Sequence, residues 1–240
     1  MTEMTILFEK NEVLDREYFI AELGKNRDFK IELSSGKSVD TVSVKSDNGL
    51  LKDYVWEAIA SVILQCHKFR AISTRLFKMG AIKLQECLII GALLGFDAAS
   101  ERKEILEQMT HYNNSISING LLKFKLQEVA NNWVSLVYLA TKLLLQCADK
   151  SDYLDVVFFL MAASCNADKR MLICNREGQI RLDLDGEEII IPTLTENHEG
   201  NALIALISQS PTTINIINKE RVSGNFYNIV KCLGEHVATK

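Results

Sequence analysis

Alternation of hydrophobic and polar residues marks positions 1–48 as a small α/β piece. A short apolar run predicts a strand at residues 4–8, and residues 15–23 have the spacing of a helix that begins at an aspartate. Apolar and charged residues then alternate through 29–44, interrupted by the turn-forming sequence Ser-Ser-Gly-Lys at 34–37. Two alternating runs joined by such a turn predict a β-hairpin.

Residues 50–165 have apolar positions at helical spacing, and this stretch contains no proline. The apolar positions between residues 118 and 145 predict one long helix, and the stretch 153–163 is apolar nearly all round, which predicts a buried helix. We expect the other helices to be separated by breaks near Gly80, Gly95 to Ala99, Tyr112 to Ser117, and Ala148 to Ser151.

Residues 168–240 return to a mixed pattern. Short runs with the pattern of strands come first and are separated by turn residues. Segments with helical spacing then alternate with further strand-like runs. The expected strands are 171–174, 179–183, 188–191, 212–217 and 236–239, and the expected helices are 202–208 and 226–233. This order predicts a C-terminal mixed α/β module.

The expected fold class is therefore α+β, with an N-terminal α/β piece (1–48), a helical middle (50–165) and a C-terminal mixed α/β module (168–240). No linker rich in proline or glycine separates these three parts. We expect them to share contacts.

Composition narrows the class of protein. The chain has 240 residues, 48% of them hydrophobic, and a formal net charge of -4, which does not favour a general polyanion-binding domain. The six cysteines form no C-x-x-C pair, and most lie in apolar helical patterns, so we expect reduced, structural thiols. The sequence has no signal-like N-terminal run and no apolar stretch of about 20 residues, which predicts a cytoplasmic protein without membrane insertion.

Three motif-like sequences favour structural interpretations. Ser35-Gly36-Lys37-Ser38 has the end of a phosphate-binding loop, but the required earlier glycine is Ile31, so a hairpin turn is favoured. The segment 182–186 has the glycine of a calcium loop, but Arg181 occupies the first ligand position, which favours a tight turn. Gly91 and Gly95 predict close packing of a soluble helix against a neighbour.

The four histidines, His67, His111, His198 and His236, lie in four separate segments without a paired metal-ligand spacing. No cysteine has the sequence context of an activated thiolate. From these patterns we assign no catalytic residue, no cofactor and no metal ligand. An enzyme stays a third alternative, which requires His198, Glu199 and Asp183 to converge in one pocket.

A basic segment is the most suggestive local feature, because no acidic residue lies between Glu57 and Glu86. If the segment is one helix, four of its cations share a face about 140° wide. These cations are Lys68, Arg75, Lys78 and Lys83. Such a face can contact nucleic-acid phosphates or an acidic protein partner. The alternative is an ordinary solvated helix face, balanced by acidic residues at 101–107.

The segment Ile118-Asn119-Gly120-Leu121-Leu122-Lys123-Phe124-Lys125-Leu126-Gln127-Glu128 resembles the helix-opening segment of the YtxC family of sporulation proteins. Residues 152–160 are similar to the next helix of that family. Residues 171–183 are similar to its strand pair, and 205–217 to its closing helix, proline turn and strand. The chain departs from the family pattern at Ala162 to Ala167, where the family has a glutamine and a proline.

This resemblance implies a role in endospore formation, and it implies no reaction, cofactor or functional residue. The leading hypothesis is a cytoplasmic, sporulation-associated protein of unknown biochemical activity that acts by protein binding or scaffolding. The alternative hypothesis is a nucleic-acid-associated protein that uses the basic face of Lys68, Arg75, Lys78 and Lys83.

Overall fold

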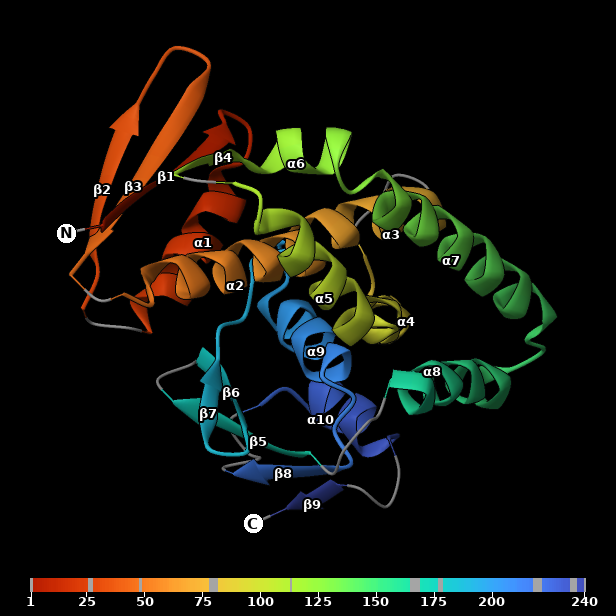
Figure 1. Cartoon of the computed structure of the whole chain (residues 1–240). Helices are drawn as coiled ribbons and strands as arrows, with labels where there is room; N and C mark the ends of the chain where they lie inside the picture. Colours follow the sequence, from red (N-terminus) through yellow and green to blue (C-terminus); the bar gives the residue numbers. More distant parts are fainter. Residues whose placement is uncertain are drawn as a thin grey trace. The chain divides into compact units, whose positions relative to one another are not determined.

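The computed structural model describes residues 2–25, 28–47, 49–77, 82–112, 114–164, 169–176, 179–217, 222–233 and 237–239. The chain forms two compact units, each made of two separate stretches of sequence (Figure 1). Unit 1 comprises Met1–Ala71 and Ala99–Val134, and unit 2 comprises Ile72–Ala98 and Ser135–Lys240. Along the chain, the elements follow the predicted order of an N-terminal α/β piece, a helical middle and a C-terminal mixed module. The predicted domain boundaries stay a prediction.

Unit 1 contains a four-stranded sheet with strand order β2-β3-β1-β4. The strands are β1 (Thr2–Glu9), β2 (Lys30–Ser35), β3 (Val39–Ser46) and β4 (Ser115–Ser117). Strands β2 and β3 form the predicted antiparallel hairpin, which is closed by a hydrogen bond of 2.9 Å from Gly36 N–H to the Val39 carbonyl. The short strand β4, which pairs parallel to β1, was not predicted.

The alternation of apolar and polar residues along β1 gives this sheet one buried face. Met4, Ile6 and Phe8 point to one side and are buried, because successive side chains of a strand face opposite ways. Helix α1 (Val13–Gly24) contributes Phe19 to the same core, and the ring centroids of Phe8 and Phe19 lie 5.5 Å apart. The predicted strand and the helix that follows it are thus confirmed.

The rest of unit 1 is helical. Helix α2 (Leu51–Val62) continues through a π-helical turn, η1 (Ile63–His67), into α3 (Lys68–Leu76). Helix α5 (Ala98–Met109), helix α6 (Ile118–Phe124) and the first residues of α7 (Gln127–Gln146) complete the unit. A π-helical turn inside a longer helix is rare and is frequent at functional sites.

The prediction of one long helix over 118–145 is wrong. The Leu121 carbonyl accepts hydrogen bonds from both the Lys125 and Leu126 amides, at 2.8 and 3.1 Å, and α6 ends at Phe124. The break leaves the Leu126 side chain fully buried, while Phe124 stays 70% exposed. Burial of Leu126 is a tertiary effect that helical spacing alone does not reveal.

Unit 2 is built around helix α4 (Leu84–Gly95) and helix α9 (His198–Ser208). Gly91 and Gly95 of α4 face α9 so closely that a Cβ at Gly91 would lie 2.7 Å from the Ile207 Cβ, and one at Gly95 would lie 2.5 Å from the Ser208 carbonyl oxygen. The predicted close packing of this glycine pair is confirmed. Helices α8 (Lys150–Ser164) and α10 (Gly224–Lys231) belong to the same unit.

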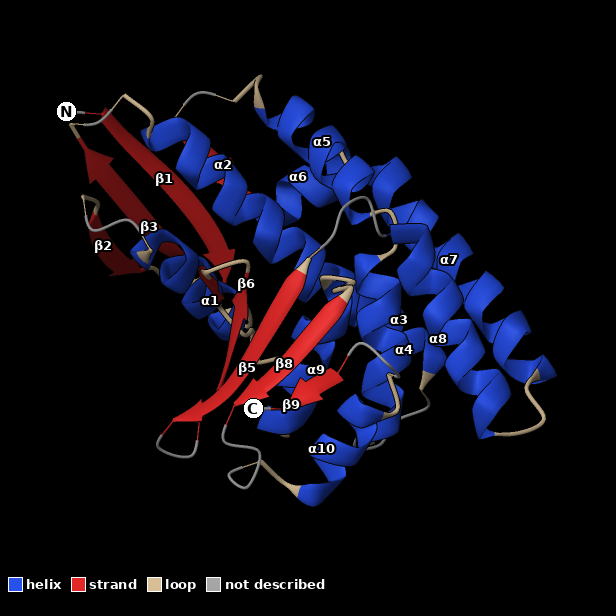
Figure 2. Ribbon diagram, turned by 90° about the horizontal axis from the view of Figure 1, so that it is seen from below, coloured by secondary structure: helices blue, strands red, loops and turns tan. Residues whose placement is uncertain are grey.

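A five-stranded sheet completes unit 2, with strand order β7-β6-β5-β8-β9 (Figure 2). Its strands are β5 (Arg170–Arg176), β6 (Gln179–Leu184), β7 (Glu187–Ile189), β8 (Thr213–Ile217) and β9 (Val237–Thr239). Strands β5, β8 and β9 are parallel neighbours, whereas β6 and β7 are antiparallel. Asp185 and Gly186 form the predicted tight turn, both with positive φ.

The fold class is α+β, as predicted. Among the described residues, no helix has both the length and the apolar character needed to span a membrane. The five described cysteines form no disulfide. Predictions that concern Lys78, Gly80, Cys165 and His236 lie outside the described residues.

Candidate functional site

The basic residues predicted as one face do not share a helix. Helix α3 ends at Leu76, and Lys83 immediately precedes α4, where its backbone N–H donates to the Glu86 carboxylate at 2.7 Å. Arg75 and Lys83 are exposed, but Lys68 is fully buried. The expectation that these residues form a single helical face is therefore wrong, because the helix ends before the segment does.

Lys68 belongs to a buried polar network, which we call the Lys68 cluster. Its ammonium Nζ donates to Glu101 Oε2 at 2.7 Å, and the indole Nε1 of Trp133 donates to Glu101 Oε1 at 2.9 Å. Each oxygen of one carboxylate is thus bonded to a buried donor. A lysine engaged in this way cannot reach a nucleic-acid phosphate without breaking a buried ion pair.

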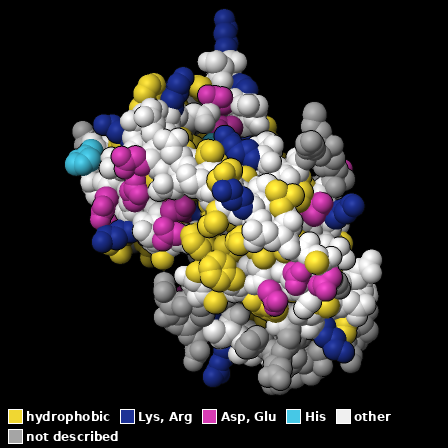
Figure 3. Space-filling view, turned by 90° about the vertical axis from the view of Figure 1, so that its right-hand side faces the viewer, with side chains coloured by type: hydrophobic (Ala, Val, Ile, Leu, Met, Phe, Trp, Pro, Cys, Tyr) yellow, Lys and Arg dark blue, Asp and Glu magenta, His cyan; other side chains and the backbone are white. Residues whose placement is uncertain are grey.

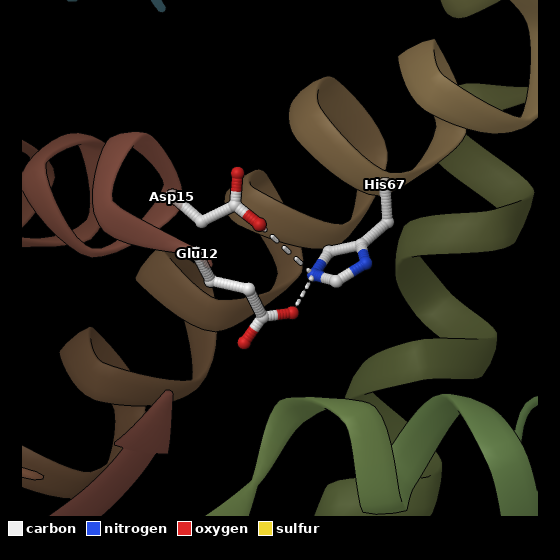
Figure 4. Close-up of side chains that lie close together, drawn as sticks. All are labelled: Glu12, Asp15 and His67. Atoms are coloured by element: carbon white, nitrogen blue, oxygen red, sulfur yellow. Dashed lines mark ion pairs between the residues drawn. The ribbon is translucent and has the colours of Figure 1, made fainter. Parts of the chain in front are cut away.

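A second buried network lies next to it in the sequence, and we call it the His67 cluster. It comprises Glu12 and Asp15 at the start of α1, His67 at the end of the π-helical turn, and Arg70 one turn further on. Figure 4 shows both carboxylates directed at the His67 ring. Glu12 is 6% exposed, Asp15 is 2% exposed, and the His67 side chain is 9% exposed.

Hydrogen bonds fix most of the atoms of the His67 cluster. Arg70 forms a bidentate pair with Asp15, with Nη1 2.7 Å from Oδ1 and Nη2 2.5 Å from Oδ2. Nη2 also lies 3.0 Å from His67 Nδ1, so Nδ1 accepts and the ring proton of a neutral His67 resides on Nε2. Glu12 Oε2 accepts the backbone N–H of Glu9 at 2.8 Å.

One buried polar atom of the His67 cluster makes no hydrogen bond to any described residue. His67 Nε2 is buried and has no hydrogen-bond partner among the described residues. It points at Asp15 Oδ2, 3.4 Å away, and at Glu12 Oε1, 3.7 Å away (Figure 4). Buried polar atoms are bonded in the great majority of cases, so an unbonded one needs an explanation.

The acidic groups of the His67 cluster outnumber its positively charged groups. The pKa of His67 is lowered to about 4, mainly by burial and also by the positive charge of Arg70, against the opposing effect of Asp15, so the ring is neutral at pH 7. Burial raises the pKa of Glu12, and the neighbouring negative charge of Asp15 acts in the same direction. Two carboxylates therefore face one guanidinium.

Two carboxylate oxygens and one neutral imidazole nitrogen make a donor set that can hold a divalent metal ion. The sequence carries no signal for this site. Glu12 and Asp15 lie in a different segment from His67, and only the packing of α1 against the continuous α2–η1–α3 helix brings them together.

The residues of the enzyme alternative do not converge. His198 is exposed at the start of α9, and Glu199 accepts hydrogen bonds from the Ser223 N–H at 3.2 Å and the Ser223 hydroxyl at 2.7 Å. Asp183 instead accepts the Gly186 N–H in the turn after β6, at 2.7 Å. Within the part of the chain that the structure describes, no hydrogen bond or ion pair joins His198, Glu199 and Asp183.

Unit 2 carries an exposed apolar surface on two helices. Tyr138 and Leu145 of α7 are 63% and 81% exposed, and Phe159 of α8 is 60% exposed. We call these three residues the α7–α8 face. On the side of the molecule shown in Figure 3, hydrophobic side chains gather at the surface among scattered charged ones.

Acidic residues accompany this face. Asp152 and Asp155 lie on the same side of α8 as Phe159, because positions 152, 155 and 159 fall within about 60° of one another at 100° per residue. On α7, the Nζ of Lys142 lies 4.5 Å from the centroid of the Tyr138 ring. No described lysine or arginine forms an ion pair with Asp152 or Asp155.

Comparison of the chain with protein-family models, with curated proteins and with solved structures finds no match in any of the three. The similarity of residues 118–128 and 152–217 to the YtxC family therefore stays a prediction. The two sites above rest on the geometry of this chain alone.

Proposed function

We propose that this protein acts by binding another protein, and that the α7–α8 face is its docking surface. The observation that carries the proposal is the exposure of three large apolar side chains in one unit, Tyr138 and Leu145 on α7 and Phe159 on α8. Exposed apolar side chains that gather on one surface are typical of protein interfaces, and aromatic anchors contribute most to their binding energy.

The spacing on α7 favours a helical partner. Tyr138 and Leu145 are seven residues apart and lie on the same side of the helix. Leu139, which is 46% exposed, widens the apolar surface on α7. A ridge of this kind matches the apolar stripe of an amphipathic helix, which presents side chains at three- and four-residue intervals.

The acidic residues on α8 favour a partner helix that carries positive charge. Asp152 and Asp155 place two carboxylates beside Phe159, and no cation in the described part of unit 2 is paired with them. A partner with lysine or arginine flanking its apolar stripe complements these carboxylates, and an acidic partner is repelled. We therefore propose a basic amphipathic helix of a partner protein as the occupant.

The setting that the YtxC resemblance implies belongs to the same proposal. A scaffold that works during endospore formation in the cytoplasm needs a surface to hold a partner and needs no catalytic centre. The measurement that bears on this setting is the level of the protein during sporulation, and a constant level in growing and sporulating cells argues against it.

The alternative, nucleic-acid binding, is weakened by the position of Lys68. Its ammonium is fully buried against Glu101, so of the described cations of the predicted face only Arg75 and Lys83 are exposed. Fewer phosphate contacts mean weaker binding and a shallower dependence on salt. A salt titration with short duplex DNA measures this dependence, and tight binding with a steep salt slope would restore the alternative.

The direct test uses fluorescence anisotropy with two synthetic 18-residue helical peptides that share one leucine stripe. One peptide has lysine on its polar face and the other has glutamate. We expect the full chain to bind the lysine peptide and to ignore the glutamate peptide. Tyr138→Ser combined with Leu145→Ser should weaken binding by about 1,000-fold, since hot-spot residues each contribute about 2 kcal/mol or more.

Phe124→Ser is the matched control, because Phe124 is 70% exposed but lies on α6 in unit 1. It should leave the affinity unchanged. Equal loss in the control and in the Tyr138–Leu145 variant would reject the α7–α8 face, as would equal binding of both peptides. Light scattering decides one further point: a concentration-dependent dimer that the same double substitution abolishes would identify a second copy as the occupant and overturn the proposal.

A further inference from the structure

We propose that the His67 cluster is a binding site for a first-row divalent transition-metal ion, held by Glu12 Oε1, Asp15 Oδ2 and His67 Nε2. This inference is independent of the docking function proposed above, because the cluster lies in unit 1 and the α7–α8 face lies in unit 2.

The first argument is the unbonded nitrogen. His67 Nε2 has no hydrogen-bond partner among the described residues although its side chain is only 9% exposed. Leaving such an atom unbonded destabilises the folded chain. A metal ion between this nitrogen and the two carboxylates removes that penalty once the ring proton moves from Nε2 to Nδ1, because the Nε2 lone pair is then free to be a ligand.

The second argument is distance. Zinc binds imidazole nitrogen and carboxylate oxygen at about 2.0–2.2 Å, so two ligands of a tetrahedral ion lie roughly 3.4 Å apart. Nε2 lies 3.4 Å from Asp15 Oδ2 and 3.7 Å from Glu12 Oε1, and the three ligand atoms all lie within 4.8 Å of one another. These separations are close to the spacing of ligands around one ion, and Glu12 and Arg70 are the groups that have to adjust.

The third argument is donor chemistry. A neutral imidazole is the form that binds a metal, and imidazole nitrogen is a common ligand of first-row transition metals. One nitrogen with two carboxylate oxygens suits zinc, cobalt, iron or manganese better than magnesium or calcium, which prefer oxygen alone. The protein supplies three ligands, which leaves a fourth position for water.

In each of the two carboxylates, a hydrogen bond to one oxygen fixes the orientation of the whole group. Glu12 Oε2 is bonded to the Glu9 N–H, and Asp15 Oδ1 is bonded to Arg70 Nη1, so the remaining oxygen of each group is the one directed at His67. Second partners of this kind hold ligating carboxylates in place at metal sites. The π-helical turn that ends at His67 fits the frequent use of such turns at functional sites.

Arg70 is the group that must move. In the structure its Nη2 donates to His67 Nδ1, but an imidazole that binds a metal through Nε2 carries its proton on Nδ1. Two donors cannot face each other, so Nη2 has to leave Nδ1 and Asp15 Oδ2 while Nη1 stays on Oδ1. The Arg70 side chain is 46% exposed, so water can solvate the guanidinium after it moves. Arg70 therefore competes with the metal for the same two atoms.

This competition gives the proposal a signature that a purely structural cluster lacks. Replacing Arg70 with methionine removes the competitor and its positive charge, so metal affinity should rise. If the cluster serves only to stabilise the fold, the same substitution leaves Asp15 without its partner and creates no metal site.

The experiment is a titration of the metal-free full chain with Co²⁺, followed by visible absorption, and then displacement of Co²⁺ by Zn²⁺. We expect one equivalent of Co²⁺ to bind. His67→Leu and Glu12→Gln should each weaken binding by at least about 10–100-fold, as loss of a group at a metal site does. Arg70→Met should tighten binding by about tenfold or more, since removal of one unit charge at close range is worth on the order of 1 kcal/mol or more.

His111→Leu is the matched control, because His111 is an exposed histidine of the same unit. Circular dichroism of each variant establishes that it is folded, and Glu12→Gln keeps the test decisive if His67→Leu does not fold. Binding that falls equally in the His111 variant indicates adventitious surface coordination and overturns the proposal. Weaker binding by Arg70→Met, or no binding by the wild-type chain, also overturns it.

Discussion

The His67 and Lys68 clusters are built on consecutive residues of one continuous helix and differ in how completely their polar atoms are bonded. In the Lys68 cluster one carboxylate receives two buried donors, from Lys68 at 2.7 Å and from Trp133 at 2.9 Å. In the His67 cluster Arg70 is bonded to Asp15 and not to the second carboxylate, Glu12, and His67 Nε2 has no hydrogen-bond partner in the described part of the chain.

This difference separates a structural network from a candidate binding site. A buried network that is fully bonded stabilises one arrangement of the chain, and removal of any member is costly. A buried network with an unbonded atom and surplus negative charge is a poor stabiliser, and it can bind a cation that supplies what is missing. Burial and charge content alone would not distinguish the two clusters.

The largest expected effect is in the Lys68 cluster. Glu101→Gln leaves the buried Lys68 ammonium without a counter-charge, so the free energy of unfolding should fall by about 3–5 kcal/mol. Urea denaturation followed by tryptophan fluorescence measures this loss in unit 1, because both tryptophans of the chain, Trp56 and Trp133, lie there.

The control is the exposed pair formed by Glu57 and Arg102, which lie 2.6 Å apart with side chains 52% and 37% exposed. Glu57→Gln should lower the free energy of unfolding by less than about 1 kcal/mol. Equal losses from Glu57→Gln and Glu101→Gln would show that the Lys68 ammonium is solvated in the folded chain.

An intermediate effect is expected at Asp15 in the metal-free protein. Asp15→Asn removes the charge from a bidentate pair, which should lower the free energy of unfolding by about 1.5–3 kcal/mol. The loss should stay below that of Glu101→Gln because the Arg70 side chain is 46% exposed and water can solvate its charge. The same urea titration gives the value, and a loss larger than that of Glu101→Gln would reverse the comparison.

A gain is expected at Glu12. Glu12→Gln removes one of two facing carboxylates but keeps an oxygen that accepts the Glu9 N–H. Since burial and Asp15 both disfavour the charged form of Glu12, the free energy of unfolding of the metal-free protein should rise by on the order of 1 kcal/mol. A fall of similar size would mean that Glu12 contributes to the fold as a simple ion-pair partner.

The smallest effect is expected at His67. His67→Leu removes the unbonded Nε2 together with Nδ1, which accepts from Arg70, and it leaves Arg70 bonded to Asp15. The free energy of unfolding of the metal-free protein should change by less than about 1 kcal/mol, because losing an unsatisfied polar atom offsets the lost contacts. Thermal melting checks this value, and a loss above about 3 kcal/mol would place His67 with Lys68 as a structural residue.

Local patterns predicted the parts of the fold that local forces determine. The hairpin of β2 and β3 follows from alternation and a turn sequence, and the packing of Gly91 and Gly95 follows from two missing side chains on one helix face. The break between α6 and α7 was missed, because it depends on the burial of Leu126 by residues distant in the sequence.

Long-range partners also explain why the two clusters were not predicted. Lysines are rarely buried, and only the distant Glu101 makes the burial of Lys68 tolerable. His67 has no second histidine at a ligand spacing, so nothing in its own segment indicates the two carboxylates of α1. In α7, helical spacing alone did not show that Leu145 faces outward.

The most direct test of the central comparison is a crystal structure of the full chain grown with Zn²⁺ and measured at the zinc absorption edge. The account predicts an anomalous peak bonded to Glu12, Asp15 and His67 Nε2, with Arg70 Nη2 withdrawn from His67 Nδ1 and the Lys68 cluster unchanged. A structure with Arg70 still bonded to His67 Nδ1 and no anomalous peak between the carboxylates would contradict it.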